Sequence, residues 1–318
     1  MIPDLRFYDF EFNLLHIAHD CISSIWSPKF NDIGTFEAHF PIKSDIVNAL
    51  FDKKYVVAVQ DGKQAIITGV QIENEFVIFG RSINYLLSKK VTPSFEKKET
   101  VSNMCIDFVN DAFKGVENIF CNANEESLEE FDFKKETYSL TSDVIRECLE
   151  KCGGGHNMEF DVKNKRWVFN VLSGHKVPYV LSEDNKTAYD LTYTLDMLSF
   201  ANKGYLEKQI EDDEESKTEW VLIDNDETKT GIYAFYTILS GETEEDAKKD
   251  LKSKEIKNET ALTVKELKYN KDYFLGDTFT VEYIIGNFKK KTEKKVVGID
   301  IVYENNLMTE KPIFEEVL

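Results

Sequence analysis

The chain lacks long apolar runs, has few cysteines and is short of basic residues. The sequence has 318 residues, and no apolar run in it is nearly as long as the roughly 20 residues of a membrane-spanning helix. The N-terminal segment carries acids where a signal peptide needs basic residues, so we expect synthesis and folding in a cytoplasm without export. The five cysteines are odd in number and have no recurrent extracellular spacing, which indicates reduced thiols and excludes a disulfide framework.

The shortage of basic residues leaves a formal net charge of −19 at pH 7, from 39 Lys and Arg against 58 Asp and Glu. Affinity for nucleic acids depends on Lys and Arg side chains that neutralise phosphates, so this balance argues against a phosphate-binding surface. It suits the opposite role, a surface past which a polyanion moves without sticking.

Strand-like patterns dominate what is present. The chain has 23 Phe and 14 Tyr, and both residue types favour strands. Its length is typical of two or three domains. A chain of this length buries enough apolar surface to fold without disulfides or structural metals. Over residues 1–95 we predict five or more short strands with regular turns, including a hairpin at Asp61-Gly62, as in a small barrel or sandwich.

Two segments far apart in the sequence share one pattern. The segment ITGVQIEN contains Gly69 and the segment VVGIDIVYEN contains Gly298, and each glycine precedes an apolar–polar–apolar alternation. Alternation at period two with a glycine at the bend predicts a half-buried, bent strand. We therefore predict that residues 55–80 and 276–303 are two copies of one small β-unit. A duplicated unit suggests a protein that matches a symmetric partner, not one built around a reaction centre.

Between residues 96 and 175 the periodicity becomes helical. Thr100 can cap one helix, and Thr141 or Ser142 can cap a second helix that ends at Gly153. A β-hairpin follows, so this stretch is interpreted as an α+β domain inserted between two β domains, residues 1–95 and 176–318.

The C-terminal part is strand-like again and contains one strongly polar helix, over about residues 242–257, that Ser240 or Thr243 can cap. Three further elements are predicted here: an exposed acidic turn at 211–215, a hairpin of strands 220–224 and 232–239, and a hairpin loop with the lysines of Lys289–Lys295. The predicted fold class is α+β, mainly β.

The sharpest chemical cluster contains Cys148, Cys152 and His156, with three glycines before the histidine. A zinc site needs a fourth ligand, and often a second Cys pair, and this cluster has neither. Because free Cys is so often core, we interpret the cluster as two buried helix thiols beside a glycine that ends the helix.

Other candidate sites also fail. Residues 224–228 begin like a calcium loop, but Lys229 and Phe235 stand where the loop needs Gly and a bidentate Glu. The many acids single out no catalytic pair, so a glycosidase arrangement can be neither found nor excluded. We predict no catalytic, cofactor-binding or metal-binding residues.

Several short blocks near the two ends of the chain are linked by their order and spacing. They are Ser24-Ile25-Trp26, Gly34-Thr35-Phe36-Glu37 with Pro41, Gly80-Arg81-Ser82-Ile83 with Leu86-Leu87, and the run from Tyr273 to Val281. Together these blocks resemble a family of tail-hub proteins from phages and prophages. The resemblance covers about half of the chain, at both ends, and not the middle. One departure is Lys89-Lys90, where the family commonly has arginines.

The resemblance implies a homotrimer, similar to the baseplate hub of contractile tails, with two tube-like β-barrels in each subunit. Three chains then present six barrels to a six-fold tail tube or distal tail protein, and three-fold symmetry to a tip fibre or spike. An acidic lumen lets DNA pass without specific binding. The implied location is the virion tail, assembled in the bacterial host.

The function that we predict is therefore structural and non-enzymatic. Two alternatives stay open: a tail-tip hydrolase of cell wall or glycan, and a host-glycan-binding module. The binding module needs exposed tryptophans, whereas at least two of Trp26, Trp167 and Trp220 lie in apolar alternation. The host, its receptor, tail contraction and the role of residues 96–175 are not predicted.

Overall fold

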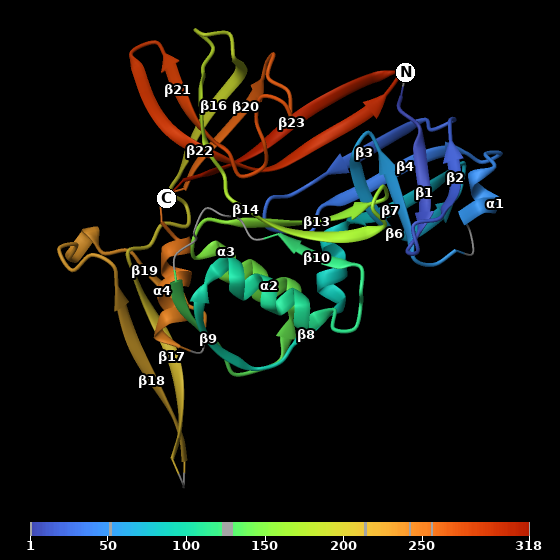
Figure 1. Ribbon diagram of the computed structural model, residues 1–318. Coiled ribbons are helices and arrows are strands. Elements are labelled where there is room, and N and C mark those ends of the chain that lie inside the picture. Colours follow the sequence, from blue (N-terminus) through green and yellow to red (C-terminus); the bar gives the residue numbers. More distant parts are fainter. Residues whose placement is uncertain are drawn as a thin grey trace. The chain divides into compact units, whose positions relative to one another are not determined.

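The computed structural model describes residues 2–50, 53–122, 130–212, 215–241, 243–255 and 257–317 (Figure 1). Its fold is α+β and mainly β, as the sequence predicts. The chain forms two compact units, Met1–Tyr189 with Thr263–Leu318, and Asp190–Leu262. Two strands run across the boundary between these units and pair with each other, β16 (Ala188–Asp196) and β20 (Lys257–Val264).

The first unit is built on one sheet of 11 strands drawn from both ends of the chain. They are β1 Leu5–Asp9, β2 Leu14–Ala18, β3 Ser23–Ser27, β4 Thr35–Pro41, β5 Val56–Gln60, β6 Lys63–Ile72, β7 Glu75–Ser82, β15 Lys176–Leu181, β21 Thr278–Ile285, β22 Phe288–Glu304 and β23 Leu307–Glu316. The order is β15-β21-β22-β3-β4-β7-β6-β5-β1-β2, and β23 pairs with β22. Strands near the two ends of the chain therefore share one ladder, through β22 and β3.

Strands β5, β6 and β7 form an antiparallel meander. Its first hairpin has a two-residue turn in which Asp61 and Gly62 both have positive φ, 49° and 78°, the geometry that an Asp-Gly pair favours. The register of β6 against β7 shifts between Ile67 and Gly69, which marks a β-bulge. The predicted hairpin and the predicted bend at Gly69 are both confirmed.

Strands β21, β22 and β23 form a second antiparallel meander with the same features. The register of β22 against β23 shifts between Val296 and Gly298, so the predicted bend at Gly298 is also confirmed. In each meander the middle strand pairs first with the strand before it and then with the strand after it. The bulge lies just beyond the end of the first pairing in both.

The predicted lysine-rich hairpin loop is wrong. Lys289–Lys295 lies within strand β22, and the hairpin turn is Gly286-Asn287, because Ile285 pairs with Phe288. Lysine can occupy a strand in this way because its long aliphatic stem packs along the sheet while the ammonium group reaches a polar partner. The Lys294 side chain is buried, with its Nζ 3.9 Å from a Glu316 carboxylate oxygen.

The middle of the chain adds helices and small sheets to the first unit. Helix α2 is capped as predicted, since Asn103 N donates to Thr100 Oγ1. The second helix is capped by Leu140 and not by Thr141 or Ser142, because the Thr141 hydroxyl is hydrogen-bonded to that of Thr92. The elements are α1 Ile46–Leu50, η1 Ile83–Lys89, β8 Val91–Thr92, β9 Phe95–Thr100, α2 Val101–Ala112, β10 Ile119–Asn122, β11 Glu130–Lys135, β12 Ser139–Leu140, α3 Thr141–Glu150, β13 Gly155–Asp161 and β14 Arg166–Leu172.

This middle region shares a core with the first strands of the sheet. The Phe12 and Phe160 rings stack at 4.3 Å between centroids, and Trp167 packs against both. The Gln64 side chain accepts from Phe160 N and donates to Phe160 O, so β6 holds β13 through a pair of hydrogen bonds. Fully burying each aromatic ring stabilises the fold by about 1.5–3 kcal/mol, which fastens residues 96–175 to the sheet.

The second unit contains the helix α4 (Glu244–Ser253) and a three-stranded sheet in which β17 (Lys203–Asp212) lies between β18 (Glu215–Asp224) and β19 (Tyr236–Leu239). The predicted hairpin of strands 220–224 and 232–239 is wrong, because β18 pairs with β17 while β19 runs parallel to β17 on its other side. The helix begins in a capping box of Thr243 and Asp246, so the cap predicted at Thr243 is confirmed. The elements are β17 Lys203–Asp212, β18 Glu215–Asp224, η2 Gly231–Tyr233, β19 Tyr236–Leu239 and α4 Glu244–Ser253.

Three of the predictions are not tested by these features. The division into domains 1–95, 96–175 and 176–318 stays a prediction, and so does the closure of each meander into a barrel. The acidic turn at 211–215 falls partly outside the described residues, because β17 ends at Asp212 and β18 begins at Glu215.

Candidate interaction surfaces

One face of the second unit's sheet is covered by its helix. Leu206, Ile223 and Leu239, one from each strand, are buried against Ala247 and Leu251 of α4. Leu206 pairs with Leu239, and Ile223 lies two residues along β18 from the partner of Leu206. The three side chains therefore lie on one face of the sheet and form part of a small core. The sheet therefore has one face that the chain itself protects from water.

The opposite face of that sheet is apolar and exposed. Tyr205 pairs with Leu222 on one side and with Ile238 on the other, so the three side chains form a row across the strands. Trp220 and Tyr236 lie on the same face in the flanking rows, and the Tyr205 and Tyr236 rings stack at 5.8 Å. Trp220 is 49% exposed and Ile238 is 71% exposed. We call these five residues the Trp220 face.

The sequence of β18 explains why this exposure is unusual. Residues 220–223 are Trp-Val-Leu-Ile, four apolar residues in succession. Such a run is typical of a strand that is covered on both faces, whereas a half-exposed strand alternates with polar residues. The helix covers only Val221 and Ile223. The Trp220 face therefore has the composition of an interface.

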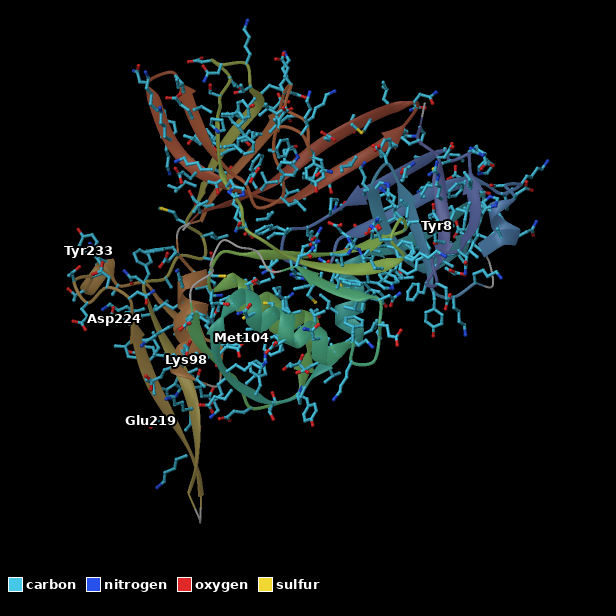
Figure 2. The ribbon with its side chains drawn as sticks, viewed as in Figure 1. Tyr8, Lys98, Met104, Glu219, Asp224 and Tyr233 are labelled. Carbon is cyan, nitrogen blue, oxygen red and sulfur yellow. The ribbon has the colours of Figure 1, made fainter. Side chains whose placement is uncertain are left out.

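One ion pair lies in the same face without giving it a net charge. Lys203 pairs with Asp224 across β17 and β18, and the Lys203 side chain is almost completely buried. The hydrogen bond to Asp224 raises the pKa of Lys203. Asp224 and Tyr233 lie near the end of the sheet, while Glu219 is farther along β18 (Figure 2). The pair satisfies its own charges, so the face offers a partner the five apolar side chains and one exposed acid, Glu207, which lies in register with Trp220.

The cysteine and histidine cluster lies in the core of the first unit. Cys148 is buried with its Sγ 3.7 Å from Met104 Sδ, and Cys152 is half-buried and donates to Leu149 O. His156 is fully buried, its Nδ1 lies 2.9 Å from Asn31 Oδ1, and burial lowers its pKa to about 4. In the described part of the chain no three His, Cys, Asp or Glu side chains are arranged to hold a metal ion.

The acidic segment that begins like a calcium loop uses its oxygens locally. Asp224 pairs with Lys203, and Asp226 Oδ1 accepts hydrogen bonds from the Thr228 backbone N–H and hydroxyl. Those hydrogen bonds lower the pKa of Asp226. This is the pattern of a turn that stabilises itself.

A histidine between two carboxylates lies on β4 of the large sheet. His39 Nδ1 is 2.8 Å from Glu75 Oε2, and its Nε2 is 2.8 Å from Glu37 Oε1. Partial burial opposes the charged imidazolium, but the hydrogen bonds and charges of the two glutamates outweigh it and raise the pKa of His39. Both ring nitrogens donate only when the ring is protonated.

A polar cavity of about 360 Å³ lies beside Trp26 in the first unit, and two of the amides that line it, Asn84 and Gln64, are already hydrogen-bonded. Asn84 accepts from Met158 N and donates to Asp32 O, and Gln64 holds Phe160 as described above. These side chains therefore join β13 to the sheet and η1 and are not aimed at a ligand. Trp26 and Trp167 are buried, which leaves Trp220 as the exposed tryptophan.

No protein-family model matches the sequence, and no curated protein matches it. Among the solved structures that match it over nearly its whole length are three tail proteins. Prophage tail protein gp18 from Listeria monocytogenes EGD-e is 13% identical with a TM-score of 0.57, over 99% of this chain and 94% of its own. A tail protein from Neisseria meningitidis MC58 is 12% identical with a TM-score of 0.59, over 99% and 97%.

The third is the 43 kDa tail protein of prophage MuSo2 from Shewanella oneidensis, 10% identical with a TM-score of 0.58, over 98% of both chains. The chain has the fold of phage and prophage tail proteins. This confirms, at the level of the fold, the resemblance carried by the sequence blocks. Among the described residues of this tail-protein fold, no helix is long and apolar enough to cross a membrane.

Proposed function

We propose that the chain is a structural tail-hub protein of a phage or a prophage-derived particle, located in the tail and without enzymatic activity. The observation that carries this proposal is the shared fold, which extends over 98–99% of the chain and includes both meanders and the middle region.

The proposed mechanism is symmetry matching. Each chain contributes two meanders, each with a bulge at its glycine, and each meander is taken to belong to one tube-like barrel. Three chains then provide six similar units to a six-fold tail tube or distal tail protein. The same trimer provides three-fold symmetry to a tip fibre or spike.

We assign the Trp220 face to the contact between copies of this chain. Five exposed aromatic and aliphatic side chains in one sheet face, with an internally neutralised ion pair, match the apolar centre of a stable subunit interface. In an isolated chain this face is in contact with water, so trimerisation supplies the missing cover.

DNA is proposed to pass through the lumen of the hub without specific binding. The net charge of −19 supports this, since like charges repel a polyanion within about a Debye length of 8–10 Å. Because of this repulsion no phosphate is held at a fixed site, and the DNA can move through the lumen.

Binding of a host glycan is the second candidate, because the exposed rings of Trp220, Tyr205 and Tyr236 also suit stacking against a sugar. The two candidates differ in what Trp220→Ala changes. In the hub account the variant assembles poorly into tails. In the glycan account it assembles normally, and the particles adsorb poorly to host cells.

An antibody against this chain tests the main proposal. Particles from cells that carry the gene are labelled and viewed in negative stain. Labelling at the tail tip, next to the end of the tube, supports a hub. Particles without label anywhere on the tail, although the chain is expressed, contradict the proposal.

A further inference from the structure

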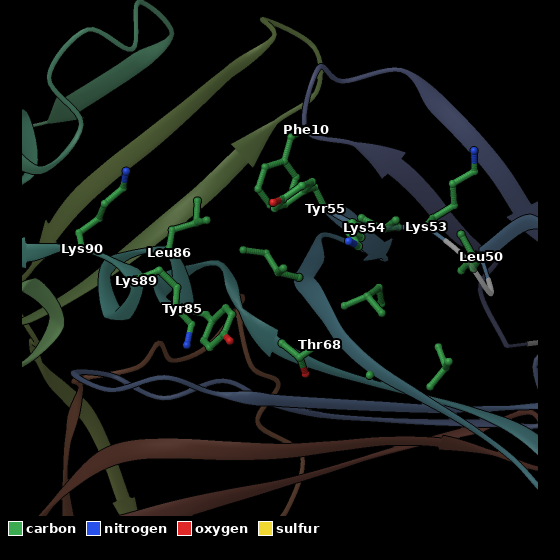
Figure 3. Close-up of a pocket in the computed structure, with 15 residues that line it drawn as sticks. Phe10, Leu50, Lys53, Lys54, Tyr55, Thr68, Tyr85, Leu86, Lys89 and Lys90 are labelled. Atoms are coloured by element: carbon green, nitrogen blue, oxygen red, sulfur yellow. The ribbon is translucent and has the colours of Figure 1, made fainter.

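The first unit contains an apolar cavity whose rim is formed by lysines. Its volume is about 600 Å³, and it lies where β5 and β6 meet η1 and the end of α1. Leu50, Val56 and Ile66 form part of its buried floor, and the rings of Tyr55 and Tyr85 line its side. The rim contains Lys53, Lys54, Lys89 and Lys90 (Figure 3). We call this cavity the lysine-rimmed pocket.

The charge of this rim is opposite to that of the whole chain. Among the described residues the lining contains four lysines and no Asp or Glu, although acids exceed bases by 58 to 39 in the sequence. Within the part of the chain that the structure describes, no ion pair joins any of these four lysines to a carboxylate. Four ammonium groups around one opening repel one another, and a bound anion relieves that repulsion.

Aromatic rings, and not carboxylates, hold two of these lysines. Lys89 Nζ lies 4.6 Å from the centroid of the Tyr85 ring, and Lys90 Nζ lies 4.8 Å from that of Phe113. Figure 3 shows Lys89 and Lys90 on one side of the pocket and Lys53 on the other. A cation over a ring keeps its charge available for an anion on its outer side.

Tyr55 is placed at the opening by an unusual backbone conformation. Its φ is 58°, in the left-handed region that a residue with a Cβ rarely adopts, and its ring packs on Phe10 at 5.4 Å. Tyr55 nevertheless remains 69% exposed, so this conformation does not serve to bury the ring. It presents a large apolar surface beside Lys53 and Lys54.

We propose that the lysine-rimmed pocket binds a segment of another protein in which an aromatic side chain is flanked by Asp and Glu. The apolar floor takes the aromatic ring, and the four lysines pair with the flanking carboxylates. A cavity of about 600 Å³ is large enough for one or two aromatic side chains. This assignment names a binding site and its ligand chemistry, and it does not depend on the role of the chain as a hub.

An acidic peptide fits this pocket better than a nucleic acid does. The floor is mostly aliphatic and offers hydrogen-bonding groups at few points, whereas a nucleotide carries polar atoms around its base. The described residues of the lining also include no arginine, whose planar fork matches phosphate best. The strongly acidic remainder of the chain repels a long polyanion but only weakly affects a segment with a few carboxylates.

Fluorescence anisotropy with the full chain and a labelled Glu-Asp-Phe-Asp-Glu peptide tests the proposal. The rim variant carries Lys54→Glu with Lys89→Glu. The matched control carries Lys229→Glu with Lys311→Glu, which changes the net charge equally at exposed positions that do not line the pocket. We expect the rim variant to bind about ten-fold more weakly than the natural chain, and the control to differ by less than about two-fold.

A second peptide, with alanine in place of the phenylalanine, tests the apolar floor. We expect its binding to be about ten-fold weaker as well, because the buried ring contributes most of the apolar contact. Circular dichroism establishes that the variants fold. Three results overturn the proposal: no binding of the first peptide at millimolar concentration, equal loss in the control, or tighter binding of a single-stranded oligonucleotide of the same charge.

Discussion

Gly69 and Gly298 occupy the same place in two meanders, each at a bulge in the middle strand. The strands on either side differ in length and sequence, and β22 is the longer middle strand. What the meanders share is the order of pairing and the position of the bend. That shared order explains the pattern that the two segments have in common in the sequence. It supports a chain that carries two copies of one unit.

Gly276→Ala is expected to destabilise the first unit. The φ of Gly276 is 91°, and a Cβ there would lie 2.2 Å from the Phe30 ring, which is buried. We predict a loss of at least about 2 kcal/mol in the free energy of unfolding, measured with urea. Gly298→Ala is the control, because its Cβ meets nothing closer than 3.4 Å. Equal losses in the two variants would contradict this account of Phe30.

His156 is expected to make the fold sensitive to acid. Burial lowers its pKa from 6.5 to about 4, so between these values the unfolded chain binds a proton that the folded chain does not. Stability therefore falls as the pH drops from about 6.5 to about 4, by about 3 kcal/mol in total. His156→Gln should flatten this dependence in urea titrations at several pH values. A pH dependence that is equally steep in His156→Gln would contradict this assignment.

His39 is expected to act in the opposite direction. Glu37 and Glu75 outweigh partial burial and raise its pKa above 6.5, so the folded chain keeps a proton that the unfolded chain has lost. The stabilisation is complete below pH 6.5 and is lost as the pH rises through the raised pKa. His39→Gln should therefore reduce the free energy of unfolding more at pH 5 than at pH 8. A larger loss at pH 8 would rule out this role.

Trp220→Glu tests the assignment of the Trp220 face. The side chain is half-exposed, so the second unit should fold with little change, while a charge in an apolar interface should abolish self-association. Light scattering at high protein concentration, with tail proteins present if needed, measures the association. The control Lys248→Ala changes the charge by the same amount on the exposed side of α4. Unchanged association of Trp220→Glu would place the subunit contact elsewhere.

Local signals explain which elements could be predicted. Asp61-Gly62, the bends at Gly69 and Gly298, and the cap at Thr100 each depend on residues close together in sequence. The parallel pairing of β17 with β19 depends on a long-range contact, so strands 220–224 and 232–239 were wrongly expected to pair. The lysines of β22 were expected in a loop because charge runs usually mark solvated turns.

The candidate surfaces were harder to predict for the same reason. The Trp220 face had a signal, the four apolar residues 220–223, but alternation alone does not say which face the helix covers. The lysine-rimmed pocket joins Lys53-Lys54 to Lys89-Lys90 only through the fold of β5, β6 and η1. In the sequence Lys89-Lys90 stood out only as a departure from the family pattern.

The central claim is that three chains present six similar units at the tip of a tail. Cryo-electron microscopy of tails from cells that carry the gene tests it most directly. We predict three copies of this chain at the end of the tube. Residues 55–80 and 276–303 should alternate around the axis at six positions, all at the same distance from it. A hub with six copies, or one in which the two segments lie at different radii, would contradict the claim.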